Sequence, residues 1–355
     1  MTKIFLIRHA EAEGNIYRRA HGHYNGLITE RGYKQIERLK KRFENEKIDA
    51  VYSSDLKRAS TTAGALSQPR DMQIIETEML REVGMGIWED MSWGDIDYIY
   101  PDMNRMFGYD PAKWSVENSE TYENVKARMS YFITEAAKRH EGGSIATFSH
   151  GFAIRALSCL LEGIPSHETD KMPYCDNTAV GLITYNNGKL KLEHHSDNSH
   201  LNDEHSTLAR QTWWRTEKKH LSENLRFMPL NEVCSADLLR IFQAKAGERA
   251  HVDMQYAAFL GDEPIGIVGI DTKRDSRQSV GWISYIHVVP THRKKTFATQ
   301  LLGLAVSDFR KLRREKLRIE IPSGSIGINF MSKCGFEALD VTDRFCLMEK
   351  NIRNW

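Results

Sequence analysis

The sequence predicts an α/β protein of two domains, a mostly parallel three-layer α/β/α domain followed by a smaller α+β domain with a mixed sheet. The chain has 355 residues, whereas one globular domain usually has about 100–200. Strand-like and helix-like runs alternate in the first half, which is typical of a parallel sheet with helices on both faces. A second pattern of strands and helices follows a polar stretch. We therefore expect domains at residues 1–201 and 225–355, joined by a segment at 202–224.

Short apolar runs bounded by turn residues predict the strands of the first domain, and longer periodic runs predict its helices. The expected strands are Ile4–Ile7, Ala50–Ser53, Ile74–Ile75, Ser144–Phe148, Ala179–Tyr185 and Lys189–His195. The expected helices are Tyr33–Asn45, Leu56–Leu66, Tyr122–Lys138 and Phe152–Leu161. Sheets of this kind bind ligands beyond the carboxyl ends of their strands, so functional residues are expected there.

The joining segment is polar and charged apart from Trp213 and Trp214, and we expect it to be partly helical with the tryptophans packed on one domain. The strands expected after it are Leu225–Leu230, Tyr256–Leu260, Pro264–Asp271, Trp282–Val289, Leu317–Ile321, Phe336–Val341 and Phe345–Lys350. The helices expected among them are Ser235–Gln243, Phe297–Leu312 and Ile326–Cys334.

The composition is ordinary for a soluble protein, with 41% hydrophobic residues, 27% charged residues and a formal net charge of +1. This balance gives no reason to expect nucleic acid or a membrane as the main partner. The five cysteines are scattered and form no CxxC pair, which indicates reduced thiols. No apolar stretch reaches the roughly 20 residues of a membrane span, and the start of the chain lacks a signal-peptide pattern. We therefore expect a cytoplasmic location.

Histidine, arginine and glutamate side chains follow separate predicted strands of the first domain. Arg8-His9 and Ser149-His150 each come directly after a strand, while Arg58 and Glu82 follow two others. Guanidinium forks meet the charge of a phosphoryl group, and a neutral imidazole attacks phosphorus to hold it covalently. A carboxylic acid protonates the leaving oxygen and later activates water. This set of residues predicts metal-independent phosphoryl transfer.

The first domain resembles the histidine phosphatase superfamily, which is also called phosphoglycerate mutase-like. The resemblance is carried in order by segments that cover about residues 1–201. These segments are Leu6-Ile7-Arg8-His9-Ala10-Glu11, Asn15, Ile28-Thr29-Glu30-Arg31-Gly32-Tyr33-Lys34-Gln35, Tyr52-Ser53-Ser54-Asp55-Leu56-Lys57-Arg58-Ala59, Leu80-Arg81-Glu82, Gly86-Ile87-Trp88-Glu89, Ser149-His150-Gly151, Asn177-Thr178-Ala179-Val180 and His200-Leu201. One departure is Ala10, where the family usually has glycine.

The resemblance implies a role for each reactive residue. His9 is the expected nucleophile, and Glu82 the acid and then the base. The phosphoryl group is expected to be clamped by Arg8, Arg58 and His150, with Asn15 touching the phosphate or the substrate. A phosphoglycerate mutase-type isomerase is an alternative, but we favour hydrolysis of a small phosphorylated metabolite. The segment Asp90–Glu117 is rich in aromatic residues and is expected to cap the site and select the substrate; the alternative is an ordinary helical lid.

Two groups of histidines invite a metal interpretation. They are His21 with His23, and His194 with His195 and His200. A loop over the substrate explains the first group, and a strand with one buried and one exposed histidine explains the second. We therefore expect no metal.

The second domain resembles the GNAT acetyltransferases. The family pattern of Arg/Gln-x-x-Gly-x-Gly/Ala at a helix start is matched by Arg293 and Ala298, with Thr296 in place of the first glycine. Backbone N–H groups at a helix start bind pyrophosphate, helped by the helix dipole. The resemblance implies an acetyl-CoA site made by Val288, Val289, Arg293, Lys294, Lys295, Thr296, Phe297 and Ala298.

Two residues leave the activity of this second domain open. The first is Thr296, in place of glycine. The second is Met331, which stands where the family often has the tyrosine that protonates the thiolate. The candidate base near the Trp282–Val289 strand is His287. A bifunctional phosphatase and N-acetyltransferase is therefore one hypothesis. The other is a phosphatase whose GNAT-like domain is inactive and binds an acyl-CoA or a partner.

Overall fold

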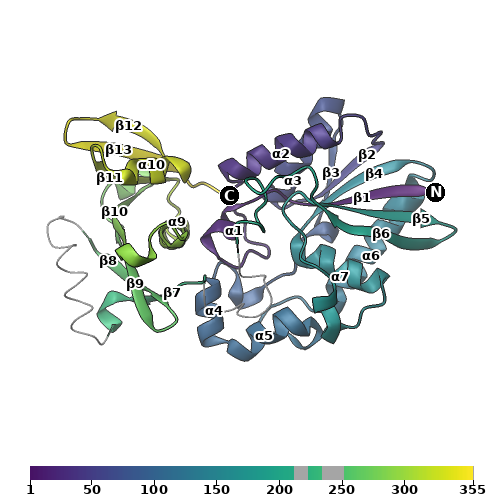
Figure 1. Cartoon of the computed structure of the whole chain (residues 1–355), viewed down its shortest axis with the longest axis horizontal. Coiled ribbons are helices and arrows are strands. Elements are labelled where there is room, and N and C mark those ends of the chain that lie inside the picture. Colours follow the sequence, from purple (N-terminus) through teal and green to yellow (C-terminus); the bar gives the residue numbers. More distant parts are fainter. Residues whose placement is uncertain (212–222, 234–251, 355) are drawn as a thin grey trace. The chain divides into compact units, whose positions relative to one another are not determined.

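The computed structural model describes residues 1–211, 223–233 and 252–354 and divides into two compact units, each considered by itself (Figure 1). The first unit consists of Met1–Ala12, Ala20–Glu89 and Ile99–Trp214. The second consists of Glu13–Arg19, Asp90–Tyr98 and Arg215–Trp355. The expected domain boundaries at residues 201 and 225 stay a prediction. The expected helix Ser235–Gln243 and the pair Trp213-Trp214 lie outside the described residues.

The first unit is built on a six-stranded sheet with the strand order β3-β2-β4-β1-β5-β6. Its strands are β1 Thr2–Arg8, β2 Ala50–Ser54, β3 Ile74–Thr77, β4 Ser144–Ser149, β5 Val180–Asn186 and β6 Lys189–Asp197. The first four are parallel, and β5 and β6 are antiparallel. The register pairs Arg8 with Ser149 and Ser53 with Phe148, so the carboxyl ends of β1, β2 and β4 lie at one edge.

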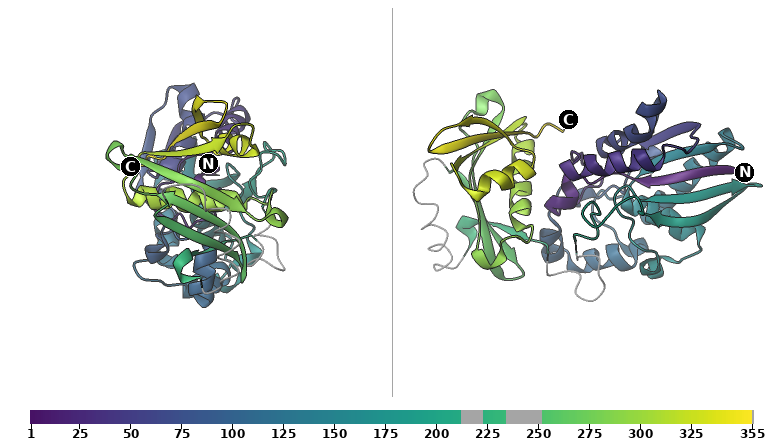
Figure 2. Two further views of the ribbon diagram at one scale, coloured as in Figure 1. Left: turned by 90° about the vertical axis from the view of Figure 1, so that its left-hand side faces the viewer. Right: turned by 45° about the horizontal axis from the view of Figure 1, so that its top comes forward.

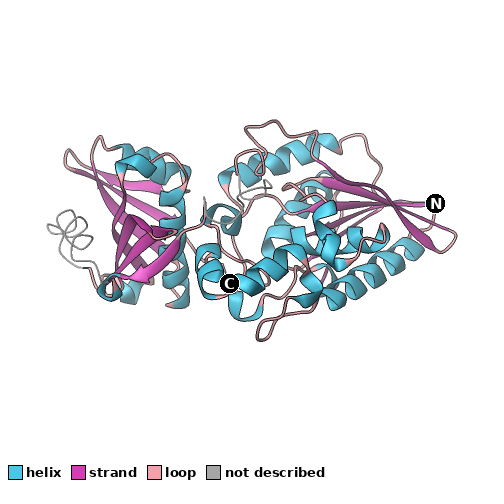
Figure 3. Cartoon of the chain, turned by 60° about the horizontal axis from the view of Figure 1, so that its bottom comes forward, coloured by secondary structure: helices cyan, strands magenta, loops and turns pink. Residues whose placement is uncertain are grey.

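Helices cover both faces of this sheet, which confirms the predicted three-layer arrangement (Figures 1 and 3). They are α2 Glu30–Arg42, α3 Lys57–Ser67, α6 Tyr122–Arg139 and α7 Gly151–Leu161, whereas α5 Pro101–Tyr109 packs on the 3-10 helices η4 and η5. Helices α2 and α3 pack with Ile36, Leu39 and their neighbours against one face, and α6 and α7 cover the other. Short 3-10 helices are η1 Gln68–Arg70, η2 Glu78–Leu80, η3 Gly86–Trp88, η4 Pro111–Lys113 and η5 Ser166–Lys171.

Helix α2 begins earlier than the expected Tyr33 because Thr29 caps it. The Thr29 hydroxyl accepts a hydrogen bond from Gly32 N at 3.0 Å, which satisfies one free N–H group of the first turn. The described residues of the expected linker, 202–211 and 223–224, contain turns and no helix.

The second unit has a seven-stranded sheet with the order β12-β13-β11-β10-β9-β8-β7 (Figure 2). Its strands are β7 Arg226–Pro229, β8 Met254–Leu260, β9 Glu263–Asp271, β10 Val280–Val288, β11 Lys316–Pro322, β12 Glu337–Val341 and β13 Phe345–Asn351. Its helical elements are α9 Phe297–Lys311, α10 Ile326–Lys333, η6 Leu230–Glu232, η7 Ser276–Gln278 and η8 Pro290–His292. The mixed sheet agrees with the predicted fold class.

Strands β10 and β11 are parallel neighbours only over part of their length. They pair from Val280 to Ile283 of β10, and the register of β10 against β9 shifts between Ile283 and Tyr285. Beyond that point β10 continues to Val288 with β9, and β11 continues with β13. The two strands therefore separate towards their carboxyl ends.

The second unit also contains two helices from the first part of the sequence, α1 Glu13–Tyr17 and most of α4 Trp93–Ile99. Helix α1 packs on α9, where Tyr17 joins the apolar core of the unit. Glu13 lies buried beside α9 and forms ion pairs with Arg310 at 2.8 Å and Lys350 at 3.3 Å. Buried charges are tolerated only when they are paired in this way.

Helices α1 and α9 approach most closely at Gly303. A Cβ atom at this position would lie 2.5 Å from Tyr17 Cβ and 2.6 Å from Tyr17 Cγ, well inside van der Waals contact. By contrast, a Cβ at Gly108 in α5 would meet nothing within 4 Å.

We expect Gly303→Ala to destabilise the protein and Gly108→Ala to stabilise it. Alanine in a helix is favoured over glycine by about 1 kcal/mol, and at Gly303 the clash with Tyr17 outweighs this gain by about 1–3 kcal/mol. Urea unfolding of both variants would measure the two changes. Equal stabilisation by both substitutions would contradict the close packing of α1 on α9.

Candidate active site

The parallel pairing of β1 with β4 brings two histidines together. His9 directly follows β1 and His150 directly follows β4, and His9 N donates a hydrogen bond to Ser149 O at 3.0 Å. Both side chains are buried, and their ring centroids are 5.1 Å apart. The two imidazoles that the sequence singles out are therefore neighbours at the carboxyl edge of the sheet.

The His9 ring is held in one tautomer. Its Nδ1 lies 2.7 Å from Ala10 O, and because a carbonyl only accepts, Nδ1 must carry the proton. Burial, followed by the nearby Arg58 and Arg8 charges, holds the pKa of His9 well below its usual value. The ring is thus neutral at pH 7 and Nε2 keeps its lone pair.

The backbone around His9 is fixed from two sides. Asn177 Nδ2 donates to His9 O at 2.9 Å, and Ala10 N donates to Thr62 Oγ1 at 2.9 Å. Both bonds fix the peptide group that follows His9, while the bond from His9 N to Ser149 O fixes the peptide group that precedes it, and together they set the direction of the ring.

His150 is fully buried and its Nε2 lies 2.9 Å from Ser54 Oγ. Its Nδ1 has no hydrogen-bond partner among the described residues. Burial, then the charges of Arg58 and His9, holds the pKa of His150 well below its usual value. A buried nitrogen without a partner is costly, and a ligand oxygen beside it would remove that cost.

Two arginines lie beside the imidazoles. Arg58, in α3, donates to Tyr24 O at 2.9 Å, His21 O at 3.1 Å and Gly22 O at 2.7 Å. Burial lowers the pKa of Arg58 to about 10, against the opposing charges of Glu82 and Glu89, so the group stays cationic at pH 7.

Arg8 donates from Nη1 to Cys175 O at 2.5 Å, and its buried Nε has no partner among the described residues. Among the described residues, no carboxylate is hydrogen-bonded to Arg8 or Arg58. Their positive charge is therefore available to an anion.

Glu82 lies at the N-terminus of helix α7. Its Oε2 accepts from Phe152 N at 3.1 Å, and its Oε1 accepts from Ala153 N at 2.9 Å and Val83 N at 3.0 Å. Arg128 holds the backbone of the same loop through Glu82 O at 3.0 Å. The helix start and its N–H groups thus fix the carboxylate, with one acceptor position of Oε2 left for a proton.

Asn15 differs from the other expected residues because it lies in α1, within the second unit. The structure brings together Arg8, His9, Arg58, Glu82 and His150, while the role expected for Asn15 stays a prediction.

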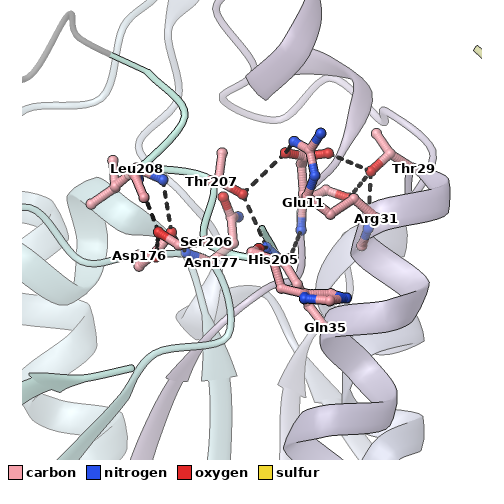
Figure 4. A network of polar contacts seen from close by, with 12 residues as sticks. Glu11, Thr29, Arg31, Gln35, Asp176, Asn177, His205, Ser206, Thr207 and Leu208 are labelled. Atoms are coloured by element: carbon pink, nitrogen blue, oxygen red, sulfur yellow. Dashed lines mark hydrogen bonds and ion pairs between the residues drawn. The ribbon is translucent and has the colours of Figure 1, made fainter. Parts of the chain in front are cut away.

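A network of polar contacts holds the segment that follows His9 (Figure 4). Glu11 accepts from Thr29 Oγ1 at 2.7 Å, Arg31 Nη1 at 2.8 Å and Thr207 Oγ1 at 3.1 Å. Glu11 N donates to Gln35 Oε1 at 2.7 Å. Asp176 accepts from Ser206 Oγ at 2.6 Å and Leu208 N at 3.2 Å. The start of the expected linker is therefore part of the first unit.

Aromatic residues of the expected lid pack next to Glu82. Phe107 stacks on Phe152 with centroids 5.0 Å apart and contacts Trp88 and Trp114, which are both buried. Tyr98 and Tyr109 are exposed instead. Because Phe152 N also donates to Glu82, this aromatic cluster borders Glu82. Its effect on substrate choice stays a prediction.

Several supporting residues carried no separate signal in the sequence analysis. Ser54 lies within the segment Tyr52–Ala59 and Glu89 ends the segment Gly86–Glu89, so these motifs were their signal, whereas Thr62 lies three residues beyond Ala59. Arg128 lies on the long helix α6 with nothing local to mark it.

Three of the histidines considered for a metal, His23, His195 and His200, are hydrogen-bonded to protein groups. His195 Nδ1 accepts from Ser158 Oγ at 2.8 Å and its Nε2 donates to Pro173 O at 3.0 Å. His200 is bonded to Arg42 and Thr178, and His23 Nε2 lies 3.0 Å from Glu82 O. Across residues 1–211, 223–233 and 252–354, no group of three or more His, Cys, Asp or Glu is arranged to hold a metal ion.

In the second unit, the residues expected to bind acetyl-CoA lie between the end of β10 and the start of α9. Arg293 Nε donates to Val288 O at 2.9 Å, which closes the loop on its own strand. Lys294 and Thr296 have φ angles of 62° and 67°, and Thr296 makes no side-chain cap bond to α9. The first N–H groups of α9 are thus left without a side-chain cap at the point where the sequence motif predicts phosphate binding.

Residues 4–198 match the family model of the histidine phosphatase superfamily (branch 1). The chain belongs to the histidine phosphatase superfamily. Residues 213–336 match the acetyltransferase (GNAT) family. Both resemblances seen in the sequence, and their order, are confirmed. No helix among the described residues is long and apolar enough to cross a membrane.

Curated relatives of this chain are named as phosphatases or as phosphoglycerate mutases. "Phosphoserine phosphatase 1" of Hydrogenobacter thermophilus is 31% identical over 183 residues, covering 52% of this chain and 86% of that protein. A "probable phosphoglycerate mutase GpmB" of Yersinia pestis is 27% identical over 172 residues, 47% of this chain and 78% of its own.

Solved structures agree on the fold of the histidine phosphatase part. Bacillus stearothermophilus YhfR aligns with a TM-score of 0.55 and 28% identity, covering 57% of this chain and all of that one (100%). The alpha-ribazole phosphatase of Shigella flexneri aligns with a TM-score of 0.50 and 23% identity, over 55% and 96% of the two chains, which supports the fold alone.

Stability of this histidine phosphatase is expected to fall as the pH drops from 7 to 5. The pKa values of His195 and His200 are lowered to about 4, mainly by burial, whereas an unfolded histidine titrates near 6.5. Below about pH 6.5 the unfolded chain therefore binds protons that the folded chain does not, and stability decreases towards pH 4. Urea midpoints between pH 7.5 and 5 would show this slope.

His195→Gln isolates one contribution, because the amide keeps a donor for Pro173 O without titrating. The variant should show a shallower pH dependence than the parent chain. An identical slope in the two proteins would refute the contribution of His195.

Proposed function

We propose that the protein is a phosphomonoester hydrolase that forms a phosphohistidine on His9. The observation that carries the proposal is a neutral His9, with its lone pair on Nε2, beside two arginines that are hydrogen-bonded to no carboxylate among the described residues. A neutral imidazole next to guanidinium groups that are not hydrogen-bonded to a carboxylate favours an incoming phosphoryl dianion and leaves the attacking lone pair available. Relatives named as phosphatases support the same reaction class.

The first step transfers the phosphoryl group to His9. Nε2 attacks phosphorus in line, the phosphorus–oxygen bond to the leaving group breaks, and protonated Glu82 gives its proton to the leaving oxygen. Arg8, Arg58 and His150 bind the phosphoryl oxygens, and the unpartnered His150 Nδ1 and Arg8 Nε are the groups that gain most.

In the second step, water hydrolyses the phosphohistidine. Glu82, now a carboxylate held by Phe152 N and Ala153 N, takes a proton from water as the water oxygen attacks phosphorus. The His9–phosphorus bond breaks and inorganic phosphate leaves. Mutase chemistry would instead return the phosphoryl group to a second hydroxyl of the substrate. We favour hydrolysis of a small phosphorylated metabolite, and phosphoserine is the first compound to test.

The deciding measurement is phosphate release from p-nitrophenyl phosphate, phosphoserine and other metabolite phosphates without added metal. We expect turnover by the parent chain, none by His9→Ala because the nucleophile is lost, and a decrease of about 10²–10⁴ in kcat for Glu82→Gln because general acid catalysis is lost. Rapid quenching should trap an acid-labile phosphohistidine.

Lys34→Ala is a matched control, since Lys34 lies exposed on α2 in a surface pair with Glu30. Equal turnover by His9→Ala and Lys34→Ala would rule out a phosphohistidine on His9. Formation of an isomeric phosphate ester without phosphate release would establish the mutase alternative.

For the second unit we propose acetyl-CoA binding at the start of α9. Three observations support it: the separation of β10 from β11, the absence of a side-chain cap on α9, and the left-handed backbone at Lys294 and Thr296. Thr296 occupies with its side chain a backbone conformation that glycine adopts freely. Met331, which stands where the family often has tyrosine, is buried. Acetyl transfer by this unit is kept as a second hypothesis.

Thr296→Gly is expected to strengthen acetyl-CoA binding several-fold, because removing the Cβ relieves left-handed strain and lets phosphates approach the backbone. Isothermal calorimetry with acetyl-CoA measures the change. Ser279→Gly is the control, since Ser279 also has a positive φ of 57° but precedes β10 instead of following it. Absence of binding by both the parent chain and Thr296→Gly would refute the site.

A further inference from the structure

The two excursions of the chain into the second unit are flanked by residues of the phosphatase site. Glu13–Arg19 begins shortly after His9 and ends just before His21 and Gly22, whose carbonyls bind Arg58. Asp90–Tyr98 begins directly after Glu89. Whatever holds these excursions therefore also holds the ends of the segments that surround Arg58.

Within the first unit, the loop that orients Arg58 is held by Glu89. His23 N donates to Glu89 Oε1 at 2.8 Å and Tyr24 N donates to Glu89 Oε2 at 2.9 Å. A Cβ on Gly22 would lie 2.3 Å from Glu89 Oε1, so the loop and the carboxylate are in tight contact. A shift of Glu89 would move the carbonyls of Gly22 and Tyr24, and Arg58 with them.

Within the second unit, the next residues of both segments form a buried ion pair. Arg19 Nε donates to Asp90 Oδ1 at 2.8 Å, and Trp93 N donates to Arg18 O at 2.9 Å. The Ser307 hydroxyl of α9 bonds both partners of the pair: it accepts from Arg19 Nη2 at 3.0 Å and donates to Asp90 Oδ2 at 2.5 Å, while Arg19 Nη1 has no hydrogen-bond partner among the described residues. All three side chains are at least nine-tenths buried.

Hydrogen bonds from neighbouring groups to a buried ion pair help to hold its geometry. Ser307 satisfies one of each, and it comes from a helix that matches the acetyltransferase family. Arg19 is one residue from Ala20 in the first unit, and Asp90 is bonded to Glu89 by the peptide link. The position of the Arg19–Asp90 pair is therefore transmitted along the chain to the loop and carboxylate that hold Arg58.

We propose that Ser307 and the Arg19–Asp90 pair position Arg58, so that phosphoryl binding in the first unit requires helix α9 of the second. Ser307 acts here as a positioning residue, remote from the reacting atoms. The inference rests on the proposed phosphatase function for its kinetic readout, but oxyanion binding by the same site tests it without turnover.

The experiment compares Ser307→Ala with Val306→Ala in the full-length chain. Val306 is buried in the apolar core of the same helix, so its truncation lowers stability without touching the ion pair. We expect Ser307→Ala to lower kcat/KM for p-nitrophenyl phosphate and the affinity for vanadate, each about tenfold, because small displacements of a clamping group are costly in phosphoryl transfer. Val306→Ala should change both by less than about twofold, and Ser307→Thr, which retains the hydroxyl, should recover most of the loss.

Calorimetric titration with vanadate separates the two proposals. If the parent chain shows no turnover but binds vanadate, and Ser307→Ala alone weakens this binding, the phosphatase proposal fails and the positioning role stands. Turnover by the parent chain with equal values for Ser307→Ala and Val306→Ala overturns the positioning role alone. Absence of both turnover and vanadate binding in the parent chain overturns both.

Discussion

The parallel pairing of β1 with β4 is the constraint on which the candidate active site depends. Its register sets Arg8 opposite Ser149, and the bond from His9 N to Ser149 O continues the ladder one residue beyond β1. The residues after the two strands must then be neighbours, and both are histidines. A register shift of one residue would turn every side chain of β1 to the other face of the sheet, so the hydrophobic core that fixes the register also fixes the distance between the two rings.

Burial and the adjacent guanidinium groups shift the pKa values of this pair of imidazoles in the same direction. Both lower the pKa of His9 and His150, which keeps the rings neutral. The cost of burying Arg58 is offset by three carbonyls, which accept its hydrogen bonds without neutralising its charge. A carboxylate in their place would satisfy the same donors but cancel the field that a phosphoryl dianion needs.

The sequence predicted the fold class and the cluster of Arg8, His9, Arg58, Glu82 and His150 because each stands at the end of a recognisable strand or helix, and the topology of a parallel sheet gathers such ends. The short helices α1 and α4 were missed, since neither is long enough to show a helical period. The buried partners of Glu13 and Asp90, on α9, were also out of reach: pairing between residues hundreds of positions apart leaves no local pattern. The same holds for Thr207, which belongs to a segment expected to be a linker yet is bonded to Glu11.

Thr296 adopts a left-handed backbone conformation although it is a β-branched residue. The GNAT-like pattern has glycine here, and Thr296 still adopts a φ of 67°, as Lys294 adopts 62°. A left-handed β-branched residue costs about 1–2 kcal/mol, and the loop retains this conformation because Arg293 closes it on Val288 O and α9 is anchored in the core by Phe297 and Leu301. The surrounding packing therefore imposes on Thr296 a geometry that glycine would adopt freely.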